Sequence, residues 1–262
     1  FSGVLNGLKI QADKLGYDIT FINTCFENRK MSYYEHCRYR NFEGVVIVCA
    51  NFDDPDVTEL MNSEIPVVTI DYVHHNCTAV TSNNIQGMED LVKYIYSQGH
   101  RKIAYIHGQE GSSVTRDRLA SFYRTIDELG LEIPDTYVRS ADYLETKGSA
   151  KQTKELLNLE DPPTCIIYPD DTSLIGGRNV IIEMGLRIPR DISVAGYDGT
   201  MISQLLYPKL TTIRQNTEMI GSEAATRLIG TIEKPRTTLV ERVVIEGSLV
   251  PGQSVGAIQP KG

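Results

Sequence analysis

The stretch LVKYIYSQGHRKIAYIH, residues 91–107, carries the pattern that decides the fold. Its first part has the apolar spacing of a helix, and its last part is a short apolar strand. Gly99 stands between them, where a glycine supplies the left-handed residue that ends a helix and turns the chain back. The same order of helix, glycine and strand recurs at residues 4–23 and 174–197.

The expected strands are short apolar runs without polar alternation. Such runs are buried on both faces, as in a parallel sheet covered by helices. Because these runs alternate with helical segments, the sequence predicts a doubly wound α/β fold. About nine or ten strands exceed the usual size of one sheet, so we expect two α/β subdomains. The clearest runs are residues 44–49, 67–70, 103–106, 165–168 and 193–197, and a further strand is expected at the β-rich residues 18–23.

Charge and composition exclude several classes of protein. The 262 residues include 26 Lys and Arg against 34 Asp and Glu, a net charge of −8, which argues against a free-standing nucleic-acid binder. No apolar run reaches the ~20 residues of a membrane helix, so no membrane segment is expected. Five cysteines form an odd set without a CxxC pair, which favours a reducing cytoplasm over a disulfide framework.

The motifs of common enzymes are missing from the sequence. It contains no GxxxxGK[ST], no GxGxxG after a strand, no GxSxG and no HExxH. His74 and His75 are adjacent but have no Cys or carboxylate at ligand spacing, so no metal site is expected. We therefore expect no catalytic residues and no cofactor.

Polar residues at the ends of the expected strands mark where a ligand would bind, because open α/β sheets bind ligands beyond the carboxyl ends of their strands. Aspartates at three of these ends favour a hydroxyl-rich ligand, since a carboxylate can accept hydrogen bonds from neighbouring hydroxyls. For Asp171, a helix N-cap before residues 172–184 is an equal alternative. Asp53 and Asp54 are expected to cap the helix at residues 57–61.

Two further residues stand out on chemical grounds. Arg118, like Arg116, lies in the first turns of an expected helix, where a cation opposes the helix dipole, so contact with a ligand is one compensating benefit. Tyr143 follows an expected strand near residues 137–140 and offers an aromatic face that could stack on a sugar ring.

Four blocks together resemble the effector-binding core of the LacI/GalR family of bacterial transcriptional repressors. They are GHRKIAYIHG at 99–108, RLASF at 118–122, ISVAGYD at 192–198 and PKLTTIRQ at 208–215. The resemblance extends from residue 1 to about residue 250. It implies a periplasmic-binding-protein-like type I fold with three crossovers between two subdomains. These would be residues 1–81 plus 214–239, and residues 82–213 plus 240–262.

The resemblance also implies which residues contact the effector. Asp170 occupies a position where the family often has Asn before Asp, and Phe1 would end an aromatic entry segment. Two residues depart from the family pattern. Asn83 stands where the family usually has an aspartate, and Gly199 stands where the family often has a second acid after the residue that matches Asp198. The residues assigned to effector binding are Phe1, Asp71, Arg118, Tyr143, Asp170, Asp198 and Gln215.

The function implied is that of a cytoplasmic, homodimeric repressor core. It would bind a small sugar-like effector in a cleft between the subdomains and control operator-DNA binding by a helix-turn-helix head that is absent from this sequence. The alternative is a periplasmic sugar-binding protein of a transporter, which has the same fold. The unpaired cysteines and the Leu-Thr-Thr-Ile block favour the repressor.

The sequence opens on a helix, residues 4–14, and this has a consequence for the first sheet. In a sheet of order 2-1-3-4-5, the strand before that helix lies between the strands at residues 18–23 and 44–49. Without it, those strands would be about 9–10 Å apart. We therefore expect a short apolar strand upstream, and direct pairing of the two strands would contradict the assigned topology.

Overall fold

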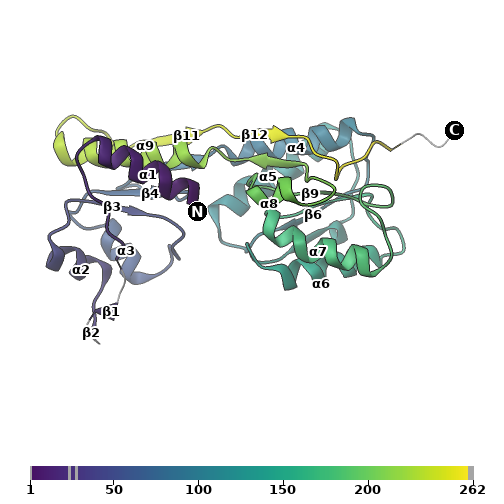
Figure 1. The fold of residues 1–262 in the computed structure, drawn as a ribbon, viewed down its shortest axis with the longest axis horizontal. Helices are drawn as coiled ribbons and strands as arrows, with labels where there is room; N and C mark the ends of the chain where they lie inside the picture. Colours follow the sequence, from purple (N-terminus) through teal and green to yellow (C-terminus); the bar gives the residue numbers. More distant parts are fainter. Residues whose placement is uncertain (1, 23–24, 27–28, 259–262) are drawn as a thin grey trace. The chain divides into compact units, whose positions relative to one another are not determined.

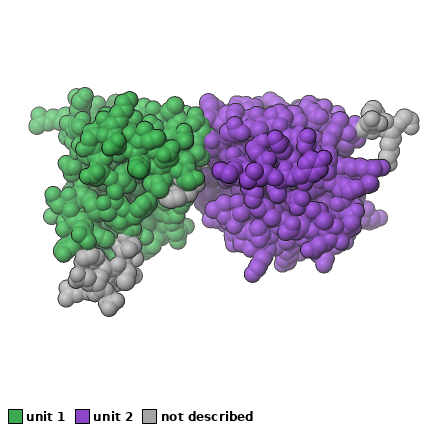
Figure 2. All heavy atoms as spheres, viewed as in Figure 1, with its two compact units in different colours: residues 1–82, 216–245 green, residues 83–215, 246–262 purple. Residues whose placement is uncertain are grey.

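The computed structural model describes residues 2–22, 25–26 and 29–258. The chain forms two compact units, each built from helices and a parallel sheet (Figures 1 and 2). Unit 1 consists of residues 1–82 and 216–245, and unit 2 of residues 83–215 and 246–262. Within the described residues, no helix has the length and apolar character needed to cross a membrane. The parallel α/β architecture expected from the sequence is confirmed.

Unit 1 is organised around a parallel sheet of order β11-β5-β4-β3. Every residue of β4 and β5 is buried, which accounts for their continuous apolar patterning. One cluster of apolar side chains joins the sheet to α1 and α9, and a second joins it to α2 and α3. The strands are β3 (Val45–Ile47), β4 (Val67–Ile70), β5 (Thr78–Ser82) and β11 (Arg242–Ile245), with a separate antiparallel pair β1 (Cys25–Phe26) and β2 (Arg29–Lys30). The helices are α1 (Ser2–Lys14), α2 (Tyr33–Arg40), α3 (Pro55–Met61) and α9 (Thr217–Glu233).

Helices α1 and α9 lie side by side and contact each other through their backbones (Figure 1). A Cβ atom on Gly7 would come within 2.0 Å of the carbonyl oxygen of Glu218. A Cβ atom on Gly221 would come equally close, 2.0 Å, to the carbonyl oxygen of Val4. The two helices therefore pack this closely only because glycine stands at both positions.

The strand expected at residues 18–23 is not formed in its described part, residues 18–22. Residues 18–22 carry no regular secondary structure, and residue 23 lies outside the described residues. A strand exists only through hydrogen bonds to a neighbour, and among the described residues β3 pairs only with β4. Residues 18–22 do not pair directly with β3, so the arrangement that would contradict the assigned topology is not seen.

Unit 2 contains a parallel sheet of order β7-β6-β8-β9. Alternate residues of β6 face opposite clusters: Ile103 and Tyr105 pack against α4 and α5, while Ala104 and Ile106 pack against α6 and α7. All residues of β6, β8 and β9 are buried. The strands are β6 (Ile103–His107), β7 (Val138–Ser140), β8 (Cys165–Ile167) and β9 (Ser193–Ala195), and an antiparallel pair is formed by β10 (Thr212–Arg214) and β12 (Ser248–Val250). The helices are α4 (Asn84–Ser97), α5 (Ser113–Glu128), α6 (Thr146–Leu157), α7 (Asp171–Glu183) and α8 (Met201–Leu205), with one 3-10 turn, η1 (Asp135–Tyr137).

Two sequence predictions about helix ends can be checked directly. Gly99 has φ +93° and follows α4, as the helix–glycine–strand pattern requires. Asp54 is the N-cap of α3, and its carboxylate accepts a hydrogen bond from the backbone N–H of Asp56, which confirms the predicted capping role.

Candidate functional site

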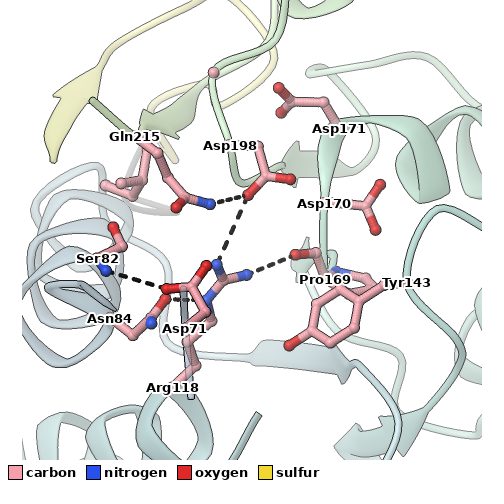
Figure 3. Close-up of polar contacts among 12 residues, drawn as sticks. Asp71, Ser82, Asn84, Arg118, Tyr143, Pro169, Asp170, Asp171, Asp198 and Gln215 are labelled. Carbon is pink, nitrogen blue, oxygen red and sulfur yellow. Dashed lines mark hydrogen bonds and ion pairs between the residues drawn. The ribbon is translucent and has the colours of Figure 1, made fainter. Parts of the chain in front are cut away.

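Polar side chains gather at the carboxyl edge of the unit 2 sheet (Figure 3). Pro169 and Asp170 follow β8, Asp198 follows β9, and Gln215 directly follows β10. Arg118 comes from the second turn of α5, the helix that follows β6. Five of the residues predicted to bind an effector, namely Arg118, Tyr143, Asp170, Asp198 and Gln215, belong to this unit.

Arg118 is the buried centre of the cluster, with a side chain only 3% exposed. Its Nε donates a hydrogen bond to Oδ1 of Asn84 (2.8 Å), and its Nη1 donates to the carbonyl oxygen of Pro169 (3.0 Å). Its guanidinium carbon lies 3.5 Å from the centre of the Tyr197 ring, a cation–π distance. A buried charge is tolerated only when it is paired and hydrogen-bonded, so these contacts hold the guanidinium in one place.

Asp198 is the anionic partner of Arg118. Its Oδ1 lies 3.7 Å from Nη2 of Arg118 and also accepts a hydrogen bond from Nε2 of Gln215. The backbone of Asp198 is left-handed, with φ +92°, a conformation that costs free energy in a residue with a side chain and is concentrated at functional sites. Burial raises the pKa of Asp198, while the charge of Arg118 opposes that rise.

Tyr143 is fixed against the same edge of the sheet. Its ring lies so close to Gly108 that a Cβ atom there would come within 2.1 Å of a ring carbon. Its hydroxyl forms a hydrogen bond with Oγ1 of Thr115 (2.9 Å), and its ring centre is 5.8 Å from the guanidinium carbon of Arg118. The aromatic residue predicted from the sequence is therefore brought beside Arg118.

Asp170 is buried and acts as the N-cap of α7. Its Oδ1 accepts hydrogen bonds from the backbone N–H groups of Thr172 (2.9 Å) and Ser173 (2.8 Å). Its Oδ2 accepts from the backbone N–H of Leu144 (2.8 Å) and from the hydroxyl of Ser173 (2.7 Å). The capping role considered for Asp171 is therefore wrong by one residue, because α7 begins at Asp171 and Asp170 has the extended backbone of a cap.

Asp171 instead joins α7 to the loop after β9 and to β10. The side chain is fully buried, and its carboxylate accepts hydrogen bonds from the backbone N–H (2.7 Å) and hydroxyl (3.0 Å) of Thr200 and from the hydroxyl of Thr212 (2.8 Å). Burial raises the pKa of Asp171 to about 7, although these hydrogen bonds favour the charged form.

The other predicted site residue within the described part of the chain, Asp71, belongs to unit 1. Asp71 follows β4 with φ +59°, and its Oδ1 accepts a hydrogen bond from the backbone N–H of Ser82 (3.2 Å). Phe1 lies outside the described residues.

Sequence reasoning missed three residues that hold the unit 2 cluster together. Asn84 accepts from Arg118, Thr115 bonds to Tyr143, and Tyr197 lies beneath the guanidinium. The signal for Tyr197 was present, because it lies within the Gly-Tyr-Asp block, but no pattern in the sequence joins Asn84 to Arg118. In the described part of the chain, no group of three or more His, Cys, Asp or Glu side chains is placed to hold a metal ion.

Comparison with known proteins gives consistent matches along most of the chain. Residues 92–255 match the model of the periplasmic binding protein-like domain. The HTH-type transcriptional repressor PurR of Aliivibrio salmonicida is 27% identical over 237 residues, which make up 89% of this chain and 71% of that protein.

Two solved structures extend the comparison to the fold. A regulatory protein of the LacI family from Chloroflexus aggregans is 26% identical with a TM-score of 0.83, over 98% of this chain and 92% of that one. A LacI family transcriptional regulator from Enterococcus faecium with bound ribose is 21% identical with a TM-score of 0.85, over 99% and 95% of the two chains. At 21% identity the second likeness shows the fold alone.

Proposed function

The chain belongs to the periplasmic binding protein-like family, and from this membership we propose that it senses a neutral, sugar-like effector for a LacI-family transcriptional repressor. The chain is the effector-binding core of such a regulator. We assign operator binding to a helix-turn-helix head of the kind named in its repressor relative. The proposed setting is the cytoplasm, where operator DNA lies, and the proposed assembly is a homodimer, which sedimentation of the protein would detect.

The observation that carries the proposal is the cluster of Arg118, Asp198, Gln215 and Tyr143 at one edge of the unit 2 sheet. A carboxylate accepts hydrogen bonds from effector hydroxyls, and an amide side chain both donates and accepts. An aromatic ring packs against the apolar face of a sugar ring. These are the groups that recognise a polyhydroxyl ring.

The charge balance of the cluster favours a neutral effector over a phosphorylated or carboxylated one. Asp198 lies 3.7 Å from Arg118, so the positive charge of this arginine already has an anionic partner. An added anion would have to compete with Asp198 for the guanidinium and would be repelled by its carboxylate. The bound ribose in the Enterococcus faecium regulator is a ligand of the proposed class.

Control of DNA binding requires the effector to favour one conformation of the core over another. We assign Asp71 to the effector site as a contribution of unit 1, as the resemblance implies. The alternative, a periplasmic sugar-binding protein of a transporter, is disfavoured because the relatives with assigned roles are transcriptional regulators. We propose no catalytic activity.

A thermal-shift screen tests the proposal. The purified chain is melted with D-ribose, cellobiose, D-ribose 5-phosphate or adenine, each at millimolar concentration. A ligand that binds only the folded state stabilises it by about 2.7 kcal/mol at one hundred times its Kd. We expect a neutral sugar to raise the melting temperature. A rise with only the phosphate or only adenine would contradict the proposed effector class, and no rise at all would contradict sugar sensing.

A further inference from the structure

Asp170 has its hydrogen-bonding capacity taken up by the protein itself. Its two carboxylate oxygens accept four hydrogen bonds, from the N–H groups of Leu144, Thr172 and Ser173 and from the Ser173 hydroxyl. An ionised carboxylate offers about four acceptor positions. Asp170 is also only 1% exposed as a residue. An effector hydroxyl would therefore have to displace an existing partner in order to bind Asp170.

One of these four hydrogen bonds, from the N–H of Leu144, does not cap α7, because Leu144 lies outside that helix. Leu144 has φ +59°, the left-handed region, and the residue is 67% exposed. Leucine has no polar group to offset the cost of that backbone, and an exposed side chain gains little from burial. The bond from the N–H of Leu144 to Oδ2 of Asp170 (2.8 Å) is charge-assisted, so it is strong enough to offset the cost of this conformation.

Leu144 in turn controls the direction of the residue before it. Tyr143 has its ring against Gly108 and its hydroxyl on Thr115, and its backbone continues directly into the peptide whose N–H belongs to Leu144. If Leu144 returned to a right-handed or extended backbone, that peptide would rotate and the ring would leave Gly108. Figure 3 shows Tyr143 beside Pro169 and Asp170.

We propose that Asp170 is a positioning residue and not an effector ligand: it holds Leu144 in the left-handed conformation and thereby fixes the Tyr143 ring as a stacking platform. The stacking of an effector on this ring rests on the proposed function. The link from Asp170 through Leu144 to Tyr143 does not, and it can be measured without any effector.

The chain contains no tryptophan, so Tyr143→Trp introduces a single fluorescent reporter at the platform. In this background, Asp170→Asn keeps an oxygen for the N–H groups of Thr172 and Ser173 but turns an NH₂ donor toward Leu144. We expect the introduced indole to become more accessible to acrylamide, by about twofold or more in its quenching constant, and to emit at longer wavelength. Unchanged quenching and emission would overturn the proposal.

The matched control is Asp54→Asn in the same background. Asp54 is also an aspartate N-cap, but its described side-chain bond serves its own helix, at the N–H of Asp56. This variant should leave the fluorescence of the introduced indole unchanged. If both variants changed the signal equally, the effect would reflect general loss of a cap, and the specific role of Asp170 would be rejected.

A rescue experiment separates positioning from direct effector contact. Asparagine adopts the left-handed backbone more readily than leucine, so Leu144→Asn should compensate for the loss of the Asp170 bond. In variants that keep Tyr143, calorimetry measures the affinity for D-ribose or cellobiose, whichever gives the larger thermal shift. We expect Asp170→Asn to lose about tenfold in affinity and the double variant with Leu144→Asn to regain most of it. A loss that Leu144→Asn does not restore would assign Asp170 to direct contact.

Two outcomes keep the test decisive. If neither sugar binds the wild-type protein, the proposed function fails, while the fluorescence of the Tyr143→Trp reporter still decides the positioning role. If Asp170→Asn shows no cooperative melting, Asp170→Ser replaces it, because a serine hydroxyl can cap α7 but is too short to reach Leu144. The same quenching measurement then supports or rejects the proposal.

Discussion

The guanidinium carbon of Arg118 lies 3.5 Å from the centre of the Tyr197 ring, so a charge buried in unit 2 is supported by an aromatic face. Tyr197 directly precedes Asp198, the anionic partner of the same arginine. Two neighbouring residues after β9 therefore stabilise Arg118 by different means.

Arg118→Lys should destabilise the protein. A lysine cannot reproduce the bonds to Asn84 and to the Pro169 carbonyl, and it leaves those buried acceptors without their donor. We expect a loss of about 1.5–3 kcal/mol in the free energy of unfolding, measured by urea denaturation. Arg116→Lys, two residues earlier and exposed, is the control and should change stability by less than about 0.5 kcal/mol. Equal effects of the two substitutions would contradict the central role of Arg118.

Asp198→Asn should weaken effector binding. It removes the negative charge that faces Arg118 and the anionic acceptor for an effector hydroxyl. Loss of one charge-assisted hydrogen bond corresponds to about a tenfold to hundredfold loss in affinity, measured by calorimetry with the sugar found in the thermal-shift screen. Unchanged affinity would remove Asp198 from the site.

Gly108→Ala should displace the Tyr143 ring. The added Cβ atom would lie 2.1 to 2.7 Å from three ring carbons, which is closer than any real contact. We expect this variant to lose about as much sugar affinity as Tyr143→Ala, roughly tenfold. Tyr143→Phe keeps the ring and loses only the bond to Thr115, so it should retain most of the affinity. If Gly108→Ala binds normally, the ring position does not matter for binding.

Two glycines of α9 should respond in opposite directions to the same substitution. Gly221→Ala places a Cβ atom 2.0 Å from the carbonyl oxygen of Val4 and should cost about 1–3 kcal/mol by forcing α1 away. At Gly230 the nearest atom would be 3.9 Å away, so Gly230→Ala should raise stability by up to about 1 kcal/mol through helix propensity. Thermal or urea unfolding measures both, and the same sign for both would contradict the backbone contact of α1 with α9.

The raised pKa of Asp171 predicts that the free energy of unfolding depends on pH. Burial raises its pKa from an ordinary 3.8 to about 7, so between these pH values the folded state holds a proton that the unfolded state has lost. Its contribution is most favourable below about pH 4, and stability falls as pH rises toward 7.

The measurement compares wild type with Asp171→Asn, which cannot ionise. The difference in unfolding free energy, wild type minus variant, should fall by up to about 4 kcal/mol between pH 4 and pH 8. A difference that stays constant over this range would show that the pKa of Asp171 is the same in the folded and the unfolded state.

The strands of unit 2 could be predicted because their signal is local. In β6, β8 and β9 every residue is buried, and an uninterrupted apolar run is the direct consequence in sequence. The strand expected at residues 18–23 had a similar β-rich composition, but a strand depends on a partner, which composition does not report. Local patterns therefore indicate which segments could be strands and not which ones are paired.

Part of the candidate site could be predicted because some of its residues also carry a local signal in the sequence. Arg118, Asp198 and Tyr143 were identified by strand ends, an unusual cation at a helix start and a family resemblance. The bond from Arg118 to Asn84 joins residues 34 apart, and no local pattern contains it. The N-cap of α7 was misplaced by one residue because Asp170 and Asp171 are chemically identical, and only the backbone of the folded chain distinguishes them.

Arg118, Asp198 and Gln215 hold one another in position through contacts made within unit 2. Immobilising a flexible side chain on binding costs about 0.5–1.5 kcal/mol, and here that ordering occurs during folding. Capture of an effector should therefore involve little rearrangement of these three side chains. Since association then requires no slow local step, effectors of different affinity should differ mainly in how long they remain bound.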